Sequence, residues 1–537
     1  MLTAEIKGKV QSLWDRLWAG GLANPITAIE QISYLLFMKR LENFKNNPPS
    51  KYKWSSYHSE SGEKLIVLLP KIFEYIKTEL ADKDEPFAKA MKDAVFLINT
   101  PSLLKDAINF IDDIYKEIEK QEKDDNQYFQ DIQGDVYEYL LRHTSEAGKN
   151  GQFRTPRHII QLMAELLKPD VDGKICDLAC GSSGFLVGAY QYVITKYSKK
   201  VVKDNNGLSK GVDGGKLTKK QKVDLKENTF YGFDIDQTMV RIGMMNLMMH
   251  GITHPNIEHI DTLSLRYEAL EAKRLKEPNT DNEDSFDKPK TNSKRKKENW
   301  WLNPKLRGQY KYILANPPFT GKINSATISD NLTRIYSKDK KTVQSELLFL
   351  ERMIYMLEEG GKACVIVPEG VLFNSSSAHV STRKLLMYDC NLKGIVSLPA
   401  GVFQPYTGVK TSILLFEKRK YNSDIPITTN VWFYEMKSDG YSLDSNRKKL
   451  KENPLPIIIN KWNEWDKTKI PQENKKLQYF NIPFDEIEKN KFELNLNRYK
   501  EFEYVAEEYR APMEILTELN ELEEEILKGL KRLEVDE

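Results

Sequence analysis

The sequence predicts an α/β protein in three parts: an all-helical N-terminal domain over residues 1–150, a domain with a mostly parallel sheet over residues 151–485, and a helical tail over residues 486–537. Three observations lead to this prediction. Apolar residues recur at helical spacing before Gly151, short apolar strands alternate with helical stretches after it, and an apolar stripe at helical spacing begins at Met513. A chain of 537 residues has room for roughly three or four compact units.

The N-terminal domain carries helical periodicity along most of its length. Its first helix begins near Ile6 and ends at Gly20-Gly21, and Asn24-Pro25 is typical of the start of the second. Further helical stretches cover residues 65–80, 103–118 and 132–141. Because helical domains mostly act through packing, we interpret this part as a scaffold in preference to a domain that contacts DNA directly.

Seven apolar segments after Gly151 are candidate strands of one sheet: residues 174–178, 229–234, 257–260, 310–315, 363–368, 392–398 and 411–416. The helices between these strands include residues 238–250 and 344–357. Two polar segments interrupt the alternation. Their low hydrophobicity predicts surface-loop insertions at about residues 199–228 and 270–300.

Composition excludes several classes of protein. The 80 Lys and Arg residues against 78 Asp and Glu residues leave a net charge of +2, so overall charge does not indicate a nucleic-acid partner. The four cysteines are too few and too scattered for a disulfide framework or a zinc ribbon. The N-terminus has no cleavable apolar segment, and no apolar run reaches about 18 residues. We therefore expect a cytoplasmic protein without a membrane span.

The first predicted strand ends at Asp177 and is followed by small residues up to Gly184, which predicts a tight strand-to-helix turn. A nicotinamide-dinucleotide fingerprint would need glycine where this chain has Ser183 and Leu186, so that cofactor fits poorly. An acidic residue at the end of the strand suits a ligand that carries a positive amino group.

Two more acidic residues follow the next two strands. Asp234 can accept two hydrogen bonds from a ribose diol, and Asp261 offers an acceptor to an exocyclic adenine amine. The distance in sequence from the glycine turn to Asp234 is longer than the usual value of about 20 residues, and the 199–228 insertion accounts for the excess. Because ligands bind at the carboxyl edge of such sheets, the three acids together indicate a nucleoside site.

The strongest motif is Asn316-Pro317-Pro318-Phe319, directly after an apolar strand. An amine conjugated to a ring is a weak nucleophile because its lone pair is delocalised. An Asn oxygen and a backbone carbonyl such as that of Pro317 can accept both N–H bonds and draw the nitrogen toward tetrahedral geometry. The two prolines stiffen the turn, and Phe319 offers a face on which an extruded base can stack.

In this order along the chain, the motifs resemble those of the S-adenosylmethionine-dependent DNA adenine-N6 methyltransferases of the gamma motif order. Nearly the whole chain, including residues 398–411, is similar to the modification subunits of type I restriction-modification systems. The resemblance implies a Rossmann-like methyltransferase fold with a seven-stranded, mostly parallel sheet in residues 151–485. It also implies methyl transfer from S-adenosylmethionine to N6 of adenine in double-stranded DNA, which protects host DNA from restriction and needs no metal.

The resemblance assigns roles to two groups of residues. The catalytic group is Asn316, Pro317, Pro318 and Phe319. The cofactor-binding group is Gln152, Phe153, Arg154, Thr155, Pro156, Arg157, Asp177, Ala179, Gly181, Ser182, Ser183, Gly184, Asp234, Asp261 and Leu263. The chain departs from the family pattern at two of these positions: many relatives carry an aromatic residue at the position of Arg154 and a glutamate at that of Asp234.

The resemblance also implies partners. Two modification subunits assemble with one specificity subunit, which reads the DNA sequence, and a restriction subunit joins the full complex on DNA whose target adenine is flipped out. The apolar stripe from Met513 to Leu533 is a docking element for the specificity subunit or, with equal weight, a surface that packs on its own domain.

Two other interpretations remain open from the residues. Enzymes that methylate a protein glutamine or an RNA guanine share the Asn-Pro-Pro-aromatic motif, although their chains are typically much smaller. A scaffold that keeps the fold without turnover is the other alternative, against which stand the three acids and Asn316.

Overall fold

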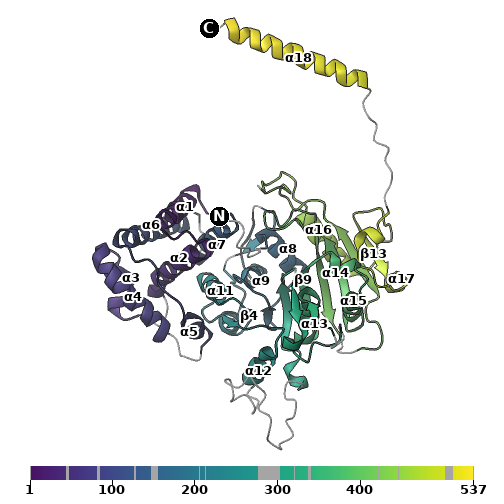
Figure 1. Ribbon diagram of the computed structural model, residues 1–537, viewed down its shortest axis with the longest axis horizontal. Helices are drawn as coiled ribbons and strands as arrows, with labels where there is room; N and C mark the ends of the chain where they lie inside the picture. Colours follow the sequence, from purple (N-terminus) through teal and green to yellow (C-terminus); the bar gives the residue numbers. More distant parts are fainter. Residues whose placement is uncertain are drawn as a thin grey trace, which may run out of the picture. The chain divides into compact units, whose positions relative to one another are not determined.

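The computed structural model describes residues 2–43, 48–80, 85–125, 129–146, 155–204, 206–211, 213–275, 303–319, 321–336, 340–419, 423–445, 447–501 and 512–535. Contacts divide the chain into two compact units, Met1–Tyr499 and Lys500–Glu537 (Figure 1). The domain boundaries at residues 150 and 485 remain predictions.

The N-terminal region is helical, as predicted, and no strand occurs among its described residues. Asn24 begins the second helix as expected: its side-chain oxygen accepts hydrogen bonds from the backbone N–H groups of Ile26 and Thr27. The helices are α1 (Ala4–Ala19), α2 (Pro25–Arg40), α3 (Trp54–Tyr57), α4 (Gly62–Thr78), α5 (Pro86–Met91), α6 (Pro101–Asp125) and α7 (Phe129–Glu146).

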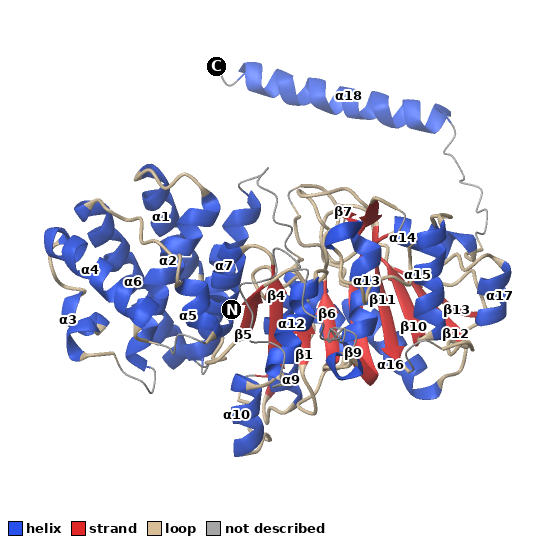
Figure 2. Cartoon of the chain, turned by 60° about the horizontal axis from the view of Figure 1, so that its bottom comes forward, coloured by secondary structure: helices blue, strands red, loops and turns tan. Residues whose placement is uncertain are grey.

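The main sheet has nine strands in the order β13-β12-β10-β11-β9-β6-β1-β4-β5 (Figure 2). Strands β5, β4, β1, β6 and β9 run parallel, whereas β11 is antiparallel to both of its neighbours. The strands are β1 (Ile175–Asp177), β4 (Phe230–Asp234), β5 (Asn256–His259), β6 (Tyr310–Ala315), β9 (Leu357–Pro368), β10 (Cys390–Ser397), β11 (Thr411–Lys418), β12 (Asn430–Glu435) and β13 (Tyr479–Pro483).

All seven predicted strands are present, but the sheet has nine strands rather than the seven that the resemblance implies. Strands β12 and β13 extend the sheet beyond β10. They lie after the last predicted strand, on either side of the helix Leu455–Thr468, and long polar segments separate them from the rest of the sheet in the sequence. β12 pairs in parallel with β10 and β13 pairs antiparallel with β12, contacts that only the tertiary structure reveals.

Helices cover both faces of the sheet (Figure 2). Alternate strand residues face two apolar cores: Tyr312 and Leu314 belong to the first, Ile313 and Ala315 to the second. The first core also contains residues of the N-terminal helices, so the helical region and the sheet share one core. The remaining long helices of this unit are α8 (Arg157–Leu167), α9 (Gly184–Lys196), α11 (Gln237–Met249), α12 (Leu265–Arg274), α13 (Ser345–Met356), α15 (Ser377–Tyr388) and α16 (Leu455–Thr468).

The insertion at residues 199–228 is more ordered than the predicted surface loop. It forms a hairpin of β2 (Val201–Lys203) and β3 (Ser209–Gly211), followed by helix α10 (Lys219–Glu227). Buried leucines attach the insertion to the core, and a capping box begins α10. These few features are difficult to recognise in a segment whose composition is mostly polar. Of the second insertion, α12 extends to Arg274, and residues 276–302 lie outside the described residues.

Further short elements of this unit are α14 (Gly370–Phe373), α17 (Phe484–Lys489), and the hairpin of β7 (Lys322–Asn324) and β8 (Thr342–Gln344), together with short 3-10 helices.

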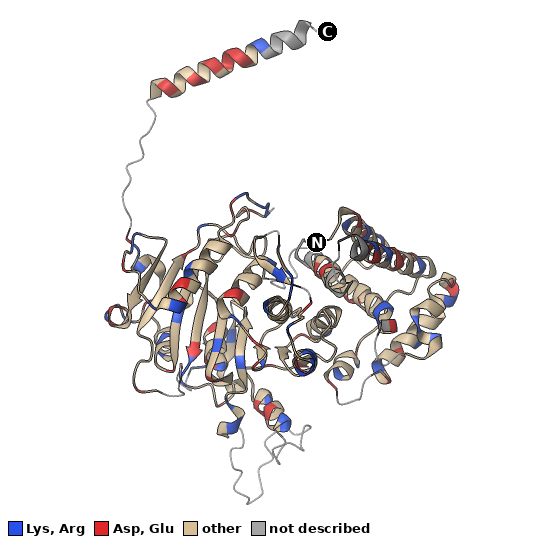
Figure 3. Cartoon of the chain, turned by 180° about the vertical axis from the view of Figure 1, so that it is seen from behind, with Lys and Arg blue, Asp and Glu red and all other residues tan. Residues whose placement is uncertain are grey.

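The second unit contains helix α18 (Pro512–Val535), which confirms the predicted C-terminal helix. Its side chains are exposed from Pro512 to Lys528, including Leu516, Leu519 and Leu522 of the predicted stripe. Acidic residues alternate with this stripe (Figure 3). Among the described residues, no helix is both long enough and apolar enough to cross a membrane.

Candidate active site

Four neighbouring parallel strands bring the predicted site residues to one edge of the sheet. Asp177 and Asp234 are the last residues of β1 and β4, Asp261 lies two residues after β5, and Asn316 directly follows β6. Since all four strands run parallel, their carboxyl ends lie at the same edge. The arrangement that the sequence predicted for the three acids and the Asn-Pro-Pro-Phe motif is therefore present.

Residues 178–184 form a tight turn, called here the cofactor loop. Gly181 and Ser183 both have left-handed backbone conformations, with φ of 48° and 62°. The backbone N–H of Cys180 donates to the carbonyl oxygen of Phe233 at 2.9 Å, and that of Gly181 donates to Asp234 Oδ2 at 2.8 Å. The loop is thus fastened to the end of β4.

Asp177 is a fully buried carboxyl group beneath this loop. Its Oδ1 accepts a hydrogen bond from the backbone N–H of Ala179 at 3.1 Å, whereas Oδ2 accepts none from the described residues. Burial, and to a lesser extent the charge of Asp234, raises the pKa of Asp177 to about 8. A buried acceptor without a partner fits the positive amino group of S-adenosylmethionine.

Asp234 and Asp261 face the same edge from the next two strands. Asp234 Oδ1 accepts from the backbone N–H of Asp236 at 2.9 Å, and burial raises the pKa of Asp234. Asp261 Oδ1 accepts from the backbone N–H of Leu263 at 2.9 Å. Because each carboxylate oxygen has two acceptor positions, both side chains keep capacity for the hydroxyl and amine donors of a nucleoside.

Asn316 is oriented by a residue 161 positions earlier in the chain. Its Nδ2 donates to Thr155 Oγ1 at 2.9 Å, which leaves Oδ1 buried and without a hydrogen-bond donor among the described residues. Pro317 is buried and Pro318 is exposed. This geometry makes Asn316 Oδ1 a fixed acceptor, as the chemistry of the motif requires.

Phe319 packs edge-to-face on Phe403, with ring centroids 5.8 Å apart. Phe403 belongs to the segment between β10 and β11, which the sequence singled out as a stretch without assigning a role to this ring. A second aromatic residue near the predicted stacking residue is thus added to the site.

The structure describes only the second half of the segment at residues 152–157, whose contact with the cofactor stays a prediction. Gln152, Phe153 and Arg154 lie outside the described residues. Thr155 is buried against Asn316, and Pro156 precedes the first turn of α8. Arg157 reaches α7, where its Nη1 lies 2.7 Å from Asp135 Oδ1 and 3.0 Å from Glu138 Oε2.

The strand order β5-β4-β1-β6-β9-β11-β10, with β11 antiparallel to both of its neighbours, is that of the S-adenosylmethionine-dependent methyltransferase fold. The chain belongs to the N-6 DNA methylase family, whose model matches residues 128–508. The family recognised from the motifs is thereby confirmed, and with it adenine-specific DNA methyltransferase activity.

Known proteins of similar length resemble this chain, one in sequence and two in fold. The chain is 28% identical to the methylase subunit of type I restriction enzyme EcoEI from Escherichia coli, over 97% of this chain and 95% of that protein. A structure of a type I restriction-modification system superposes with a TM-score of 0.62 at 22% identity, covering 97% and 96% of the two chains. A putative modification subunit from Vibrio vulnificus YJ016 gives 0.62 at 21%, covering 91% and 94%.

Proposed function

We propose that this chain is the modification subunit of a type I restriction-modification complex and transfers a methyl group from S-adenosylmethionine to N6 of a flipped adenine in double-stranded DNA. The observation that carries the proposal is the buried Asn316 Oδ1, which accepts no hydrogen bond from the part of the chain that the structure describes and lies at the same sheet edge as the acids of the cofactor site. Family membership and the names of its relatives support the type of complex.

The chemistry follows from the side chains at this edge. Asp177 would hold the amino group of the cofactor, Asp234 its ribose and Asp261 its adenine, and the cofactor supplies an electrophilic methyl group when bound. Asn316 Oδ1 accepts an N–H of the target amine, which localises the nitrogen lone pair for in-line attack. Phe319 supports the plane of the extruded base. As the target nitrogen gains the methyl group, the bond from that group to the cofactor sulfur would break, neutral S-adenosylhomocysteine would be the leaving group and the proton of the nitrogen would pass to solvent. No covalent enzyme intermediate is needed.

The test is methyl transfer by the full chain purified with its specificity subunit. Tritium from labelled S-adenosylmethionine should enter duplex DNA, and digestion to nucleosides should place it in N6-methyladenine. Label in protein glutamine or in RNA guanine would instead favour the other two substrate classes. Cofactor binding without transfer to any of these substrates would favour a scaffold without turnover.

Sequence choice belongs to the specificity subunit in this proposal, with two copies of this chain per specificity subunit and a restriction subunit in the full complex. An overall charge of +2 agrees with weak DNA binding by this chain alone, because much of the contact with DNA phosphates would come from the partner. We expect tight, sequence-specific binding only after assembly in the cytoplasm, and an isolated chain that binds one sequence tightly would contradict this division.

Helix α18 is the proposed docking element for the specificity subunit. Leu519 and Leu522 are 55% and 50% exposed, so replacing both with glutamate should remove an apolar contact without disturbing the first unit. We expect the double variant to elute apart from the specificity subunit in size-exclusion chromatography and to keep the wild-type unfolding midpoint. Glu521→Gln with Glu524→Gln, on the same helix, is the control that should still assemble. A lower unfolding midpoint with assembly intact would show that the stripe packs on its own chain.

A further inference from the structure

Helix α11 lies between the N-terminal helices and the cofactor loop. Every residue from Met239 to Met249 is buried, so this part of the helix has no solvent-exposed face. On the side of the loop, Asn246 Nδ2 donates to the carbonyl oxygen of Ser182 at 2.7 Å. A Cβ on Gly243 would lie 2.5 Å from Ser183 Oγ and 2.8 Å from the carbonyl oxygen of Gly181. The cofactor loop therefore rests directly on this helix.

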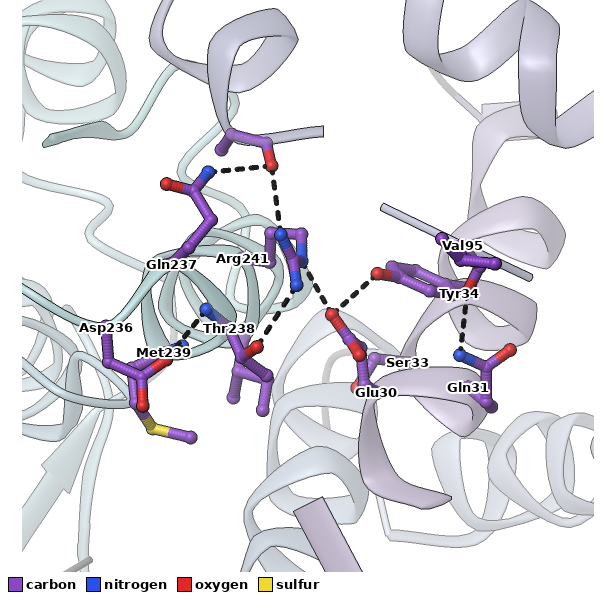
Figure 4. Close-up of polar contacts among 12 residues, drawn as sticks. Glu30, Gln31, Ser33, Tyr34, Val95, Asp236, Gln237, Thr238, Met239 and Arg241 are labelled. Atoms are coloured by element: carbon purple, nitrogen blue, oxygen red, sulfur yellow. Dashed lines mark hydrogen bonds and ion pairs between the residues drawn. The ribbon is translucent and has the colours of Figure 1, made fainter. Parts of the chain in front are cut away.

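The N-terminal helices hold the first turns of α11 through an ion pair. Arg241 Nε lies 2.6 Å from Glu30 Oε1 of α2, and Arg241 Nη1 reaches the carbonyl oxygen of Ala90 in α5 (Figure 4). Gln237 Nε2 donates to the same carbonyl oxygen at 3.0 Å. The side chains of Arg241 and Glu30 are only 9% and 12% exposed, so solvent screens their attraction little.

The last turn of α11 is held from the same helical region. Arg40 Nη1 of α2 donates to the carbonyl oxygen of Met249 at 2.7 Å and to Gln133 Oε1 of α7. A cation at the C-terminal end of a helix also interacts favourably with the helix dipole. α11 is thus fixed at both ends by residues of the N-terminal helices.

Arg157 provides a second connection, on the other side of the site. Although burial acts in the opposite direction, the charges of Arg157 and Lys210 hold the pKa of Asp135 below its usual range. Arg157 lies two residues after Thr155, which orients Asn316. In both connections the arginine follows the helical region in the chain, and its carboxylate partners belong to α2 or α7.

We propose that the N-terminal helices hold the cofactor site in its binding geometry through two ion-pair anchors, Arg241 with Glu30 and Arg157 with Asp135 and Glu138. This inference rests on the proposed function. The first anchor fixes α11 under the cofactor loop, and the second fixes the segment that carries Thr155. In this inference these five residues are positioning residues, which act on the cofactor through the loop and the segment. This role replaces the direct cofactor contact that the resemblance implied for Arg157, whose guanidinium lies on Asp135 and Glu138.

The inference can be tested by calorimetry on the full chain with S-adenosylhomocysteine, a ligand that does not react. Glu30→Gln and Asp135→Asn each keep the shape of a side chain and remove its charge. We expect each to weaken ligand binding by at least about fivefold, the lower end of usual coupling between sites. Arg241→Lys, which keeps the charge, should lose less affinity than Arg241→Met. Gly243→Ala should also weaken binding, since its Cβ displaces the loop.

The matched control is Lys39→Met. Lys39 is also on α2 and pairs with Asp112 at 3.0 Å, with exposures of 21% and 14%, but Asp112 belongs to α6 rather than to α11. We expect its unfolding midpoint to fall as in the anchor variants while its ligand affinity stays within about twofold of wild type, below the usual range of coupling.

Hydrogen exchange keeps the inference testable if an anchor variant fails to fold. By reciprocity, ligand binding to the wild-type chain should slow amide exchange in α11 and in the facing turns of α2 and α7. Unchanged affinity in both anchor variants, or unchanged exchange in these helices, would overturn the inference while leaving the proposed function in place. A wild-type chain that binds no ligand even with its partner and DNA would instead overturn both.

Discussion

Replacing Asn316 with alanine is expected to reduce the rate of methyl transfer by about 10²–10³-fold, the usual effect of removing one preorganised polar group from a transition state. The variant loses the acceptor oxygen of Asn316, whose amide nitrogen donates to Thr155, so the target amine keeps its delocalised lone pair. The cofactor loop is left intact, and ligand affinity should change little. Single-turnover transfer of tritium to duplex DNA, with the specificity subunit present, measures the rate.

Two further variants separate chemistry from orientation at this position. Asn316→Asp keeps an acceptor oxygen and should lose less activity than the alanine variant. Thr155→Val removes the hydrogen bond that orients Asn316 and should lower the rate while leaving the acceptor itself in place. Wild-type transfer by Asn316→Ala would contradict the catalytic role of this residue.

Replacing Asp177 with asparagine is expected to weaken cofactor binding strongly and to stabilise the ligand-free protein at alkaline pH. Burial raises the pKa of Asp177 to about 8 in the folded chain, from 3.8 as its ordinary value. The unfolded chain therefore binds fewer protons than the folded chain between these two values, and the stability contributed by Asp177 falls as pH rises through this interval. The asparagine variant has no such loss, so its unfolding midpoint should exceed that of wild type by several degrees at pH 8 and by little near pH 4.

Ligand binding should show the matching pH dependence. The positive amino group of the cofactor pairs with the ionised form of Asp177, so wild-type affinity should increase between pH 6 and 8 with release of a proton, which calorimetry in buffers of different ionisation enthalpy detects. Asp177→Asn should abolish that release.

Asp439 offers a control of opposite sign. Although burial acts against it, contacts with His158 and Arg447 lower the pKa of this buried carboxyl group. Asp439→Asn should therefore destabilise the protein at neutral pH. Equal stability of Asp177→Asn and wild type at all pH values would contradict the protonation state assigned to Asp177.

Features that depend on a local sequence pattern could be predicted well. Asn24 predicts the start of α2 because its side chain caps the helix. Asp177, Asp234 and Asn316 could be placed together because strand ends in a parallel sheet share an edge. The polar Asn246 and the small Gly243 among the methionines of α11 are a sequence pattern that indicates close packing against another segment.

Features that depend on distant segments could not be predicted in the same way. Nothing in the local sequence around Arg157 indicates that its guanidinium meets Asp135 and Glu138 of a helix in the N-terminal region. The hairpin inside the 199–228 insertion depends on a few buried leucines, and β13 depends on pairing with β12 alone. In each case the structure depends on a contact between segments that are far apart in the sequence, and the periodicity of either segment does not predict that contact.

The shared core also sets an order for events during synthesis. The helices up to Leu141 emerge from the ribosome before α11, which completes their apolar contacts about 100 residues later. At about 5–20 residues per second, these helices wait on the order of 5–20 s with part of their apolar surface uncovered. The bond between Thr155 and Asn316 forms later still, because β1 pairs with β6 only after residue 315 has left the ribosome. A nascent chain released before that point contains the cofactor loop but lacks the residue proposed to hold the target amine.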